Sequence, residues 1–277
     1  MGVSLKEKIA LVIIDTYANK RLPVFAIDKS LECKKISKIY TFGDTPFYSG
    51  SQFIKIANIS NAGEYSQIVL EMLPELITED HFLIIQWDGF PVNKDLWTDD
   101  FLTYDYIGAP IGANDSQRYV GNGGFSLRSS KLLRQLKKQG IKSQDPGDSE
   151  DQIICLRFRE VLQANGVQFA PINLAESFSY ESGNLTKQTF GLHSPINFPS
   201  FVSERELCEF SDDIIERIGR EEILLRYLAN CLSFGMRDLF SQSVKNYEKK
   251  PNLLKAMAFE SKYNPNSRFS EFIKSFA

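Results

Sequence analysis

The stretch Phe82-Leu83-Ile84-Ile85-Gln86-Trp87-Asp88-Gly89 decides the fold class. Its four consecutive apolar residues predict a buried central strand, and the polar tetrapeptide that follows predicts a tight turn at the carboxyl end of that strand. In open α/β sheets, ligands bind outside the carboxyl ends of the strands. The sequence therefore predicts Asp88 at a binding edge.

Further apolar runs on the amino-terminal side predict neighbouring strands at Ile9–Ile14, Lys38–Phe42 and Ile54–Ile59. The segments between them are helix-like, and Asn61 is a candidate N-cap for one of these helices. This alternation predicts an α/β fold with a mixed, mainly parallel sheet flanked by helices. Asp15 and Asp44 follow the first two strands, so we expect them at the same edge as Asp88.

The carboxyl-terminal half is richer in helical patterns. We predict a helix over about Glu150–Asn165, stopped by Gly166, then extended chain at Gln168–Pro171 and Asn173–Glu176. Residues 204–250 predict a nearly continuous helix with one apolar face. We therefore divide the chain into a domain over residues 1–200 and a helical extension over 201–277, which packs on the domain or forms a homodimer contact.

Composition restricts the class of protein. The chain has 277 residues, 43% hydrophobic and 24% charged, with a net charge of −3. These values suit an ordinary globular protein and give no electrostatic footprint for nucleic acid. Four cysteines without a CxxC pair indicate free thiols in a reducing compartment. The run Ile9–Ile14 is too short for a membrane span or a signal-peptide core, so we expect a cytoplasmic protein.

Asp88 and His193 are candidate ligands of a divalent cation. Mg²⁺ and Mn²⁺ prefer oxygen ligands, and Mn²⁺ also accepts imidazole. Each residue also has an ordinary structural interpretation. Asp88 can close an Asx-turn before Gly89, and a single histidine is often a structural hydrogen-bonding residue.

Ser149-Glu150-Asp151-Gln152 opens a predicted helix. Ser149 and Gln152 fit a capping box, and acidic side chains in a first turn complement the helix dipole. The same dipole keeps a carboxylate ionised, as a general base must be. Asp151 or Glu150 is therefore a candidate base, and the residues alone leave this choice open.

Gly121-Asn122-Gly123-Gly124-Phe125 is a flexible backbone platform. Glycines allow positive φ and let bare backbone approach a ligand closely, although an ordinary tight turn explains this segment as well. The spacing matches neither a dinucleotide-binding GxGxxG motif nor a Walker loop. Trp87 and other aromatic residues nearby are candidates to stack on a sugar or a base.

Taken together, these residues resemble the GT-A type of glycosyltransferase, whose core carries a DxD motif, a glycine-rich loop, an xED motif and a carboxyl-terminal histidine. Gln86-Trp87-Asp88, Gly121–Phe125, Ser149-Glu150-Asp151 and His193 follow that order. The strings QWDG and VGNGGFSLRS resemble a mostly bacterial family of glycosyltransferases without characterised substrates. The resemblance covers roughly residues 5–200.

The resemblance implies a Rossmann-like GT-A fold and a role for each motif. Asp88 and His193 would hold Mn²⁺ or Mg²⁺ and the donor diphosphate, and Asp151 would be the base. Glu150, Gly123 and Trp87 would contact the acceptor. Thr16, Tyr17, Asp44, Gln86, Gly124 and also Gly123 would meet the nucleotide-sugar donor. Gln86 departs from the pattern because a carboxylate usually stands there, which weakens the expectation of strict metal dependence.

The resemblance also predicts the reaction. A sugar would move from a nucleotide-diphosphate donor, UDP-sugar first, to a glycan, lipid-linked glycan or other hydroxyl acceptor, with inversion if Asp151 is the base. The setting it suggests is bacterial surface polysaccharide synthesis, in the cytoplasm or peripheral to the inner face of the membrane. Two other functions stay open: a nucleotidyltransferase, and a non-catalytic glycan- or partner-binding module that retains the fold.

Overall fold

The computed structural model describes residues 9–112, 118–182 and 188–276. The chain divides into two compact units, Met1–His193 and Ser194–Ala277. The boundary between the two units therefore follows His193, seven residues before the boundary expected from the sequence.

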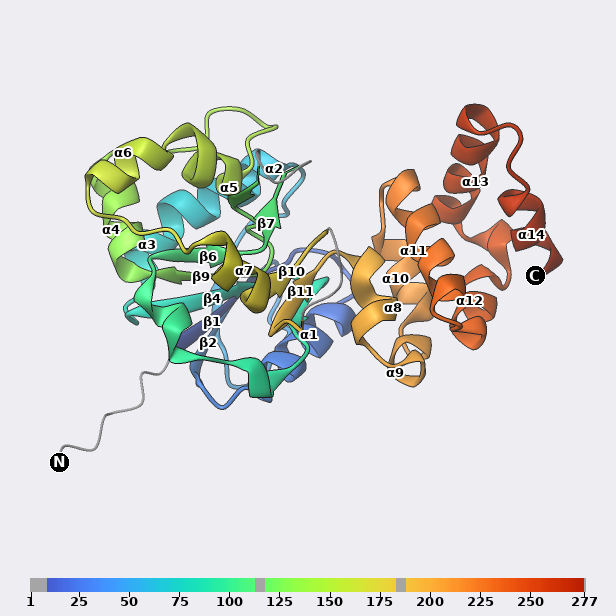
Figure 1. The fold of residues 1–277 in the computed structure, drawn as a ribbon, viewed down its shortest axis with the longest axis horizontal. Helices are drawn as coiled ribbons and strands as arrows, with labels where there is room; N and C mark the ends of the chain where they lie inside the picture. The colour runs from blue at the N-terminus through green and yellow to red at the C-terminus, as the bar shows by residue number, and fades with distance from the viewer. Residues whose placement is uncertain (1–8, 113–117, 183–187, 277) are drawn as a thin grey trace. The chain divides into compact units, whose positions relative to one another are not determined.

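A mixed six-stranded sheet forms the centre of the first unit, in the order β3-β2-β1-β4-β9-β6. Strands β3, β2, β1 and β4 are parallel, and β9 and β6 complete the sheet in antiparallel pairing. Labels β6, β9, β4, β1 and β2 follow one another in Figure 1. Their bounds are β1 Ile9–Ile14, β2 Ile36–Gly43, β3 Gln52–Lys55, β4 His81–Ile85, β6 Tyr106–Gly108 and β9 Ser126–Ser129. The predicted α/β class with a mainly parallel sheet is confirmed.

Burial explains which strands the sequence revealed. Every residue of β1 is buried, and four of the five in β4 are buried between β1 and β9. The strands predicted at Ile9–Ile14, Lys38–Phe42 and Phe82–Ile85 are confirmed. The strand predicted at Ile54–Ile59 is misplaced, because β3 is an edge strand with no buried residue and its apolar pattern is weak.

A second, three-stranded sheet joins distant segments in the order β10-β11-β5. Strand β5 (Gly89–Pro91) follows the turn after β4 and pairs antiparallel with β11 (Gly191–His193). In this register His193 lies opposite Gly89. Strand β10 (Ser179–Tyr180) pairs with β11, and β7 (Pro110–Ile111) pairs with β8 (Tyr119–Val120) in a separate two-stranded sheet.

Short helices flank the central sheet (Figure 1). Asn61 caps the first turn of α2, since its side chain accepts a hydrogen bond from the Glu64 amide, as predicted. The helices of this unit are α1 Arg21–Leu31, α2 Ala62–Gln67, α3 Leu73–Leu76, α4 Ser130–Lys138, α5 Glu150–Gln152, α6 Arg159–Ala164 and α7 Ile172–Phe178. Single π-helical stretches join α2 to α3 (Ile68–Met72) and extend α5 (Ile153–Arg157), and 3₁₀ turns lie at Lys94–Leu96 and Asp99–Thr103.

Two sequence predictions in this region are wrong. Asn173–Glu176 is helical, within α7, because Pro171 directly precedes the helix and Leu174, Ala175 and Glu176 are strong helix formers. The helix predicted over Glu150–Asn165 is broken at Phe158. Ile153, Ile154 and Cys155 are buried in succession, and the local π geometry lets three adjacent side chains face the core. Gly166 does end the last segment, with φ of 84°.

The second unit is helical, but residues 204–250 do not form the nearly continuous helix that was predicted. Four helices share this range, and the chain leaves helical geometry near Phe210, Gly219, Gly235 and Asn246. Gly235 and Asn246 have positive φ, which is typical of residues just beyond a helix end. The helices are α8 Phe198–Phe201, α9 Glu204–Cys208, α10 Ser211–Arg217, α11 Glu221–Ser233, α12 Arg237–Val244, α13 Pro251–Tyr263 and α14 Phe269–Ser275, with 3₁₀ turns at Pro195–Asn197 and Tyr247–Lys249.

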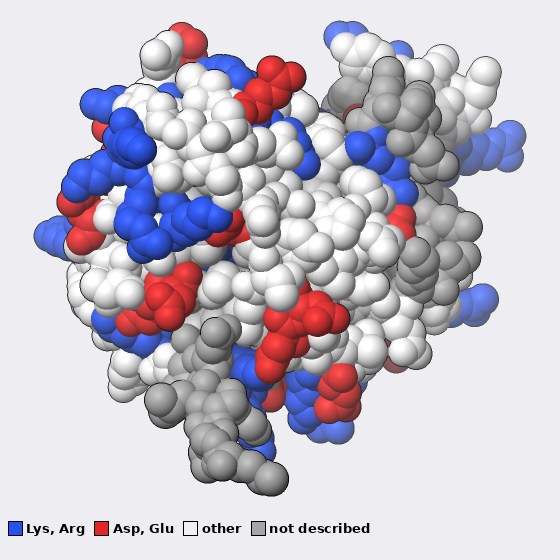
Figure 2. Space-filling model, turned by 60° about the vertical axis from the view of Figure 1, so that its left-hand side comes forward, with Lys and Arg blue, Asp and Glu red and all other residues white. Residues whose placement is uncertain are grey.

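Two expectations from composition concern the cysteines and membrane-spanning segments. All four cysteines are free thiols, as predicted. Among the described residues no helix has the length and apolar character needed to cross a bilayer. On the face shown in Figure 2, acidic and basic side chains lie among one another. The predicted homodimer contact, the peripheral membrane contact and the cytoplasmic location stay predictions.

Candidate functional site

Gly121–Phe125, here named the glycine segment, lies between two groups of polar side chains. Its shape is fixed from within: the Tyr106 hydroxyl donates to the carbonyls of Gly121 and Asn122, and Asn122 Oδ1 accepts from the Phe125 amide. These glycines are not among the residues with positive φ. Close approach requires them instead: a Cβ on Gly123 would lie 2.1 Å from Glu150 Oε1, and one on Gly124 would lie 2.1 Å from His193 Nε2.

His193 meets Asp88 because of strand register. The turn Gln86–Gly89 is closed by two backbone hydrogen bonds of 3.1 Å, and β5 starts directly after Asp88. Since β5 pairs with β11 so that Gly89 faces His193, the imidazole lies beside the turn. His193 Nε2 is 3.7 Å from Asp88 Oδ1 and 3.3 Å from Gln86 Oε1. Two of the predicted ligands are therefore neighbours in space, although 105 positions separate them in the sequence.

The other ring nitrogen of His193 is held in place. Nδ1 lies 2.7 Å from Glu181 Oε2 and 2.9 Å from Asn122 Nδ2. Burial by itself would lower the pKa of His193, but the negative charges of Glu181 and Asp88 raise it to about 9. A carboxylate bonded to Nδ1 fixes the ring orientation and leaves Nε2 directed at Asp88 and Gln86.

The donor atoms around Nε2 fit a divalent cation. They comprise one imidazole nitrogen, one carboxylate oxygen and one amide oxygen, a set that Mn²⁺ accepts. Within the described part of the chain, no group of three or more His, Cys, Asp or Glu side chains is arranged to hold a metal ion. The role of Asp88 and His193 as metal ligands stays a prediction.

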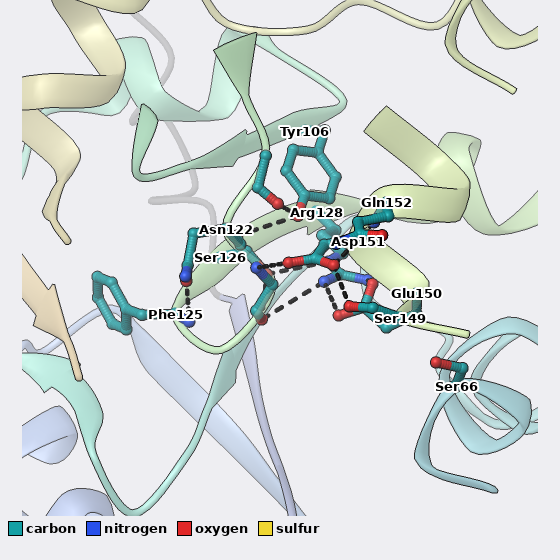
Figure 3. A network of polar contacts seen from close by, with 12 residues as sticks. Ser66, Tyr106, Asn122, Phe125, Ser126, Arg128, Ser149, Glu150, Asp151 and Gln152 are labelled. Atoms are coloured by element: carbon teal, nitrogen blue, oxygen red, sulfur yellow. Dashed lines mark hydrogen bonds and ion pairs between the residues drawn. The ribbon is translucent and has the colours of Figure 1, made fainter. Parts of the chain in front are cut away.

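Asp151 lies beside the glycine segment, together with Glu150 and Arg128 (Figure 3). Its Oδ2 accepts a hydrogen bond of 3.2 Å from the Gly123 amide, and its Oδ1 accepts from the Gln152 amide and the Ser149 hydroxyl. Ser149 occupies the N-cap position of α5 but makes no side-chain cap, so the predicted capping box is wrong. Three donors instead fix an incompletely buried carboxylate, which is the arrangement that a positioned base needs.

Glu150 faces a different environment from Asp151. Its carboxylate is 4% exposed and forms an ion pair with Arg128, whose side chain is completely buried. Burial raises the pKa of Glu150, and the positive charge of Arg128 opposes that shift. Because the neighbouring side chains enclose Glu150, of the two candidate bases only Asp151 has an accessible carboxylate.

The ends of the first two strands form a third polar group. Lys20 Nζ lies 3.4 Å from Asp15 Oδ1 and 3.2 Å from Asp44 Oδ1. The two aspartates therefore lie at one edge, as expected, and the lysine bridges their carboxylates. The hydrogen bond from Lys20 lowers the pKa of Asp44. Thr16 Oγ1 accepts from the Ile59 amide, and Tyr17 is partly exposed, 36%, beside Asp15.

The aromatic candidates divide between core and surface. Tyr106 is completely buried and belongs to the core. Trp97 is partly exposed and packs edge-on against Phe101 and Phe190. Trp87 is also partly exposed, in the turn between β4 and β5 beside Asp88, and its contact with a ligand stays a prediction.

Sequence reasoning missed three charged residues of the site: Glu181, Arg128 and Lys20. Arg128 carried only a weak signal, because serines flank it and Leu127 in the sequence. Lys20 and Glu181 carried none, because each lies in a polar loop where charge is ordinary. The fold brings Lys20 to Asp44 and Glu181 to His193 on β11, so only the fold identifies these residues.

Comparison with solved structures finds similar proteins at low identity. The glycosyltransferase GlyE of Streptococcus pneumoniae TIGR4 in its apo form has a TM-score of 0.42 and 15% identity, over 67% of this chain and 54% of that one. The galactosyltransferase LgtC in complex with donor and acceptor sugar analogues has a TM-score of 0.43 and 12% identity, over 67% and 86%. The mannosyltransferase PcManGT of Pyrobaculum calidifontis in complex with GDP-Man and Mn²⁺ has a TM-score of 0.43 and 11% identity, over 96% and 78%.

This chain thus spans about half the length of the first of these proteins. Curated protein sequences give no significant match. One family matches residues 50–193, a range that begins before β3 and ends at His193, and so includes the glycine segment, Asp88, Asp151 and Glu181. This range is just over half of the sequence, and the chain belongs to that family, which is described as protein of unknown function (DUF5672).

Proposed function

We propose that this protein is a glycosyltransferase that moves a sugar from a nucleotide-diphosphate donor to a hydroxyl acceptor. The observation that carries the proposal is the position of the glycine segment. Gly123 contacts Asp151 and Glu150, while the adjacent Gly124 contacts His193 and Gln86. A fixed carboxylate and the proposed cation ligand His193 therefore adjoin two consecutive residues, which supports the binding of one small substrate there.

The chemistry follows from this arrangement. The acceptor hydroxyl approaches the anomeric carbon, and Asp151 takes its proton as the new C–O bond forms. The bond from that carbon to the diphosphate breaks, and its electron pair stays on the departing oxygen. A single displacement of this kind inverts the anomeric centre. A divalent cation at Asp88 and His193, when bound, stabilises the charge on the diphosphate.

We assign roles to the remaining residues from their positions in the fold. Lys20, Asp44, Thr16 and Tyr17, at the ends of β1 and β2, bind the nucleotide, with UDP as the first candidate. Gln86 and Gly124 contact the donor sugar, and Trp87 and Gly123 shape the acceptor side. Glu150, expected to contact the acceptor, is enclosed by its neighbours and acts there only through Gly123. Family resemblance is the support for a bacterial polysaccharide setting.

The test measures thermal stabilisation by UDP, GDP and their sugar conjugates, each with and without Mn²⁺, followed by donor hydrolysis. We expect one nucleotide diphosphate to raise Tm more in the presence of Mn²⁺, and its sugar conjugate to be hydrolysed slowly. The variant Asp88→Asn should lose most of the Mn²⁺-dependent rise in Tm. Asp100→Asn, exposed in the 3₁₀ turn Asp99–Thr103, serves as its control.

Other outcomes select other functions. Release of pyrophosphate from a nucleoside triphosphate plus a sugar phosphate would indicate a nucleotidyltransferase. A well-folded protein that responds to no nucleotide in the panel would contradict enzymatic transfer and favour a binding module.

A further inference from the structure

A completely buried ion pair lies beneath the glycine segment. Arg128, on β9, and Glu150, at the start of α5, pair through two contacts of 2.8 Å. Arg128 Nε also donates to Ser126 Oγ, at 3.0 Å, and the guanidinium lies 4.9 Å from the centre of the Tyr106 ring. Figure 3 shows the pair together with Asp151. The contact of Arg128 Nη2 with Glu150 Oε1 is a hydrogen bond, and that of Nη1 with Oε2 is an ion pair without hydrogen-bond geometry. Together they restrict the relative orientation of the two side chains.

A buried ion pair is by itself weak evidence for a role in stability. Removing two charges from water is costly, and apolar residues of similar volume often replace a buried ion pair without loss of stability. Its position in the fold suggests another use, because each partner is connected to the candidate base. Glu150 directly precedes Asp151 in the sequence, and Arg128 reaches the backbone that contacts Asp151.

The contacts form a closed ring around Gly123. The Gly123 carbonyl accepts from Ser126 Oγ at 3.0 Å and from an Arg128 guanidinium nitrogen at 3.4 Å. The Gly123 amide donates to Asp151 Oδ2, and Asp151 is joined through the chain to Glu150, which returns to Arg128. Space is also limited, since a Cβ on Gly123 would lie 2.1 Å from Glu150 Oε1.

We propose that Arg128 and Glu150 are positioning residues that hold Asp151 and Gly123 in the reactive arrangement. This inference rests on the proposed function of Asp151 as the base. The two buried charges cancel, so Asp151 keeps the net negative charge on this side of the site. Arginine is needed for geometry as well as charge, because only its planar fork contacts Glu150 twice while also reaching Gly123.

The experiment compares the wild type with the double variant Arg128→Met/Glu150→Leu, which removes both charges and keeps the volume. We expect the variant to fold with nearly unchanged Tm and unchanged Kd for the donor. Turnover should fall by about 10²-fold, the scale of a small misplacement of a reactive group. The matched control is Lys38→Met/Glu79→Leu, an ion pair at the amino ends of the parallel strands, away from the site, where we expect unchanged turnover.

A second measurement does not depend on activity. Hydrogen exchange at the Gly123 amide, followed by NMR, should be about tenfold faster or more in the double variant than in the wild type, since local opening becomes easier. Arg128→Lys keeps the charge but loses the fork, so it should fold and show an intermediate effect in both measurements. This variant carries the test if the double variant does not fold.

The outcomes are distinct. A folded double variant with wild-type turnover and unchanged Gly123 exchange would overturn the inference and make the pair purely structural. If the wild type transfers no sugar from any donor, the proposed function fails, and the exchange measurement still decides whether the pair positions Gly123 and Asp151.

Discussion

The two sides of the glycine segment use charge in different ways. Beneath Gly123, Arg128 and Glu150 are both buried and pair one to one. Beside Gly124, His193 faces two carboxylates, those of Glu181 and Asp88, and its side chain and that of Glu181 are partly exposed. One side pairs one cation with one carboxylate and is closed. On the other, here named the open side, two carboxylates face one imidazole and the side chains are partly exposed.

This difference indicates a division of tasks. A balanced, buried pair cannot change partners without leaving a charge unpaired, so it is suited to hold geometry. An excess of carboxylate around an imidazole favours an added positive charge, a proton or a metal ion, so it is suited to bind a cation with an anionic substrate. The following variants test this division.

Asp151→Asn should have the largest effect. The amide oxygen still accepts from the Gly123 amide, so the shape persists while the basic group is lost. We expect donor binding to remain and turnover to fall by about 10²-fold or more, as for loss of a general base. Steady-state kinetics and donor titration measure the two quantities, with Asp100→Asn as control. Unchanged turnover would remove Asp151 from the chemistry.

Gly124→Ala tests the open side through packing. The added methyl group would lie 2.1 Å from His193 Nε2 and 2.8 Å from Gln86 Oε1, so the ring must move. We expect Mn²⁺-dependent turnover to fall by about 10-fold to 10²-fold, because the reacting groups are misplaced. Gly147→Ala is the matched control, since its added Cβ would meet no atom within 4 Å and its φ is not positive. Equal activity of the two variants would contradict the proposed contact.

Glu181→Gln tests the negative charge of the open side. Glutamine retains an acceptor for His193 Nδ1 but removes one of the two carboxylates. We expect the affinity for Mn²⁺, measured by calorimetry in the presence of UDP, to fall by about tenfold, as for loss of an outer-shell carboxylate. The control is Glu71→Gln, an exposed carboxylate on the π-helical stretch after α2. Wild-type affinity in Glu181→Gln would show that Glu181 has no part in binding the cation.

Asp148→Asn should have the smallest effect, on stability. Arg157 and the amides of Gln144 and Asp145 lower the pKa of Asp148 from 3.8 to about 2. A carboxylate whose pKa is lowered by folding stabilises the protein above its unfolded pKa, and this contribution is lost as pH falls through the folded value. The variant should therefore melt slightly earlier at pH 7, with the difference from wild type shrinking between pH 4 and pH 2. A constant difference across that range would refute the assignment.

Local sequence was sufficient wherever burial and side-chain chemistry act within a few residues. The apolar runs at Ile9–Ile14 and Phe82–Ile85 predicted β1 and β4, because strands buried on both faces are apolar throughout. Asn61 also predicted its cap, because an N-cap hydrogen bond joins residues within one helical turn. The local pattern was misread at Asn173–Glu176, where Pro171 and the helix formers after it favour a helix. It failed at Phe158, where a π-helical stretch depends on what the segment packs against.

By itself the sequence determined the α/β class, the edge at which Asp88 lies and the set of polar residues worth examining. Only the tertiary structure decided which of them meet. His193 lies beside Asp88 because the three-residue strands β5 and β11 pair in one register. Glu150, on α5, is enclosed because Arg128, on β9, pairs with it. Strand register and buried charge pairing depend on the combined packing of distant segments, so no short stretch of sequence contains them.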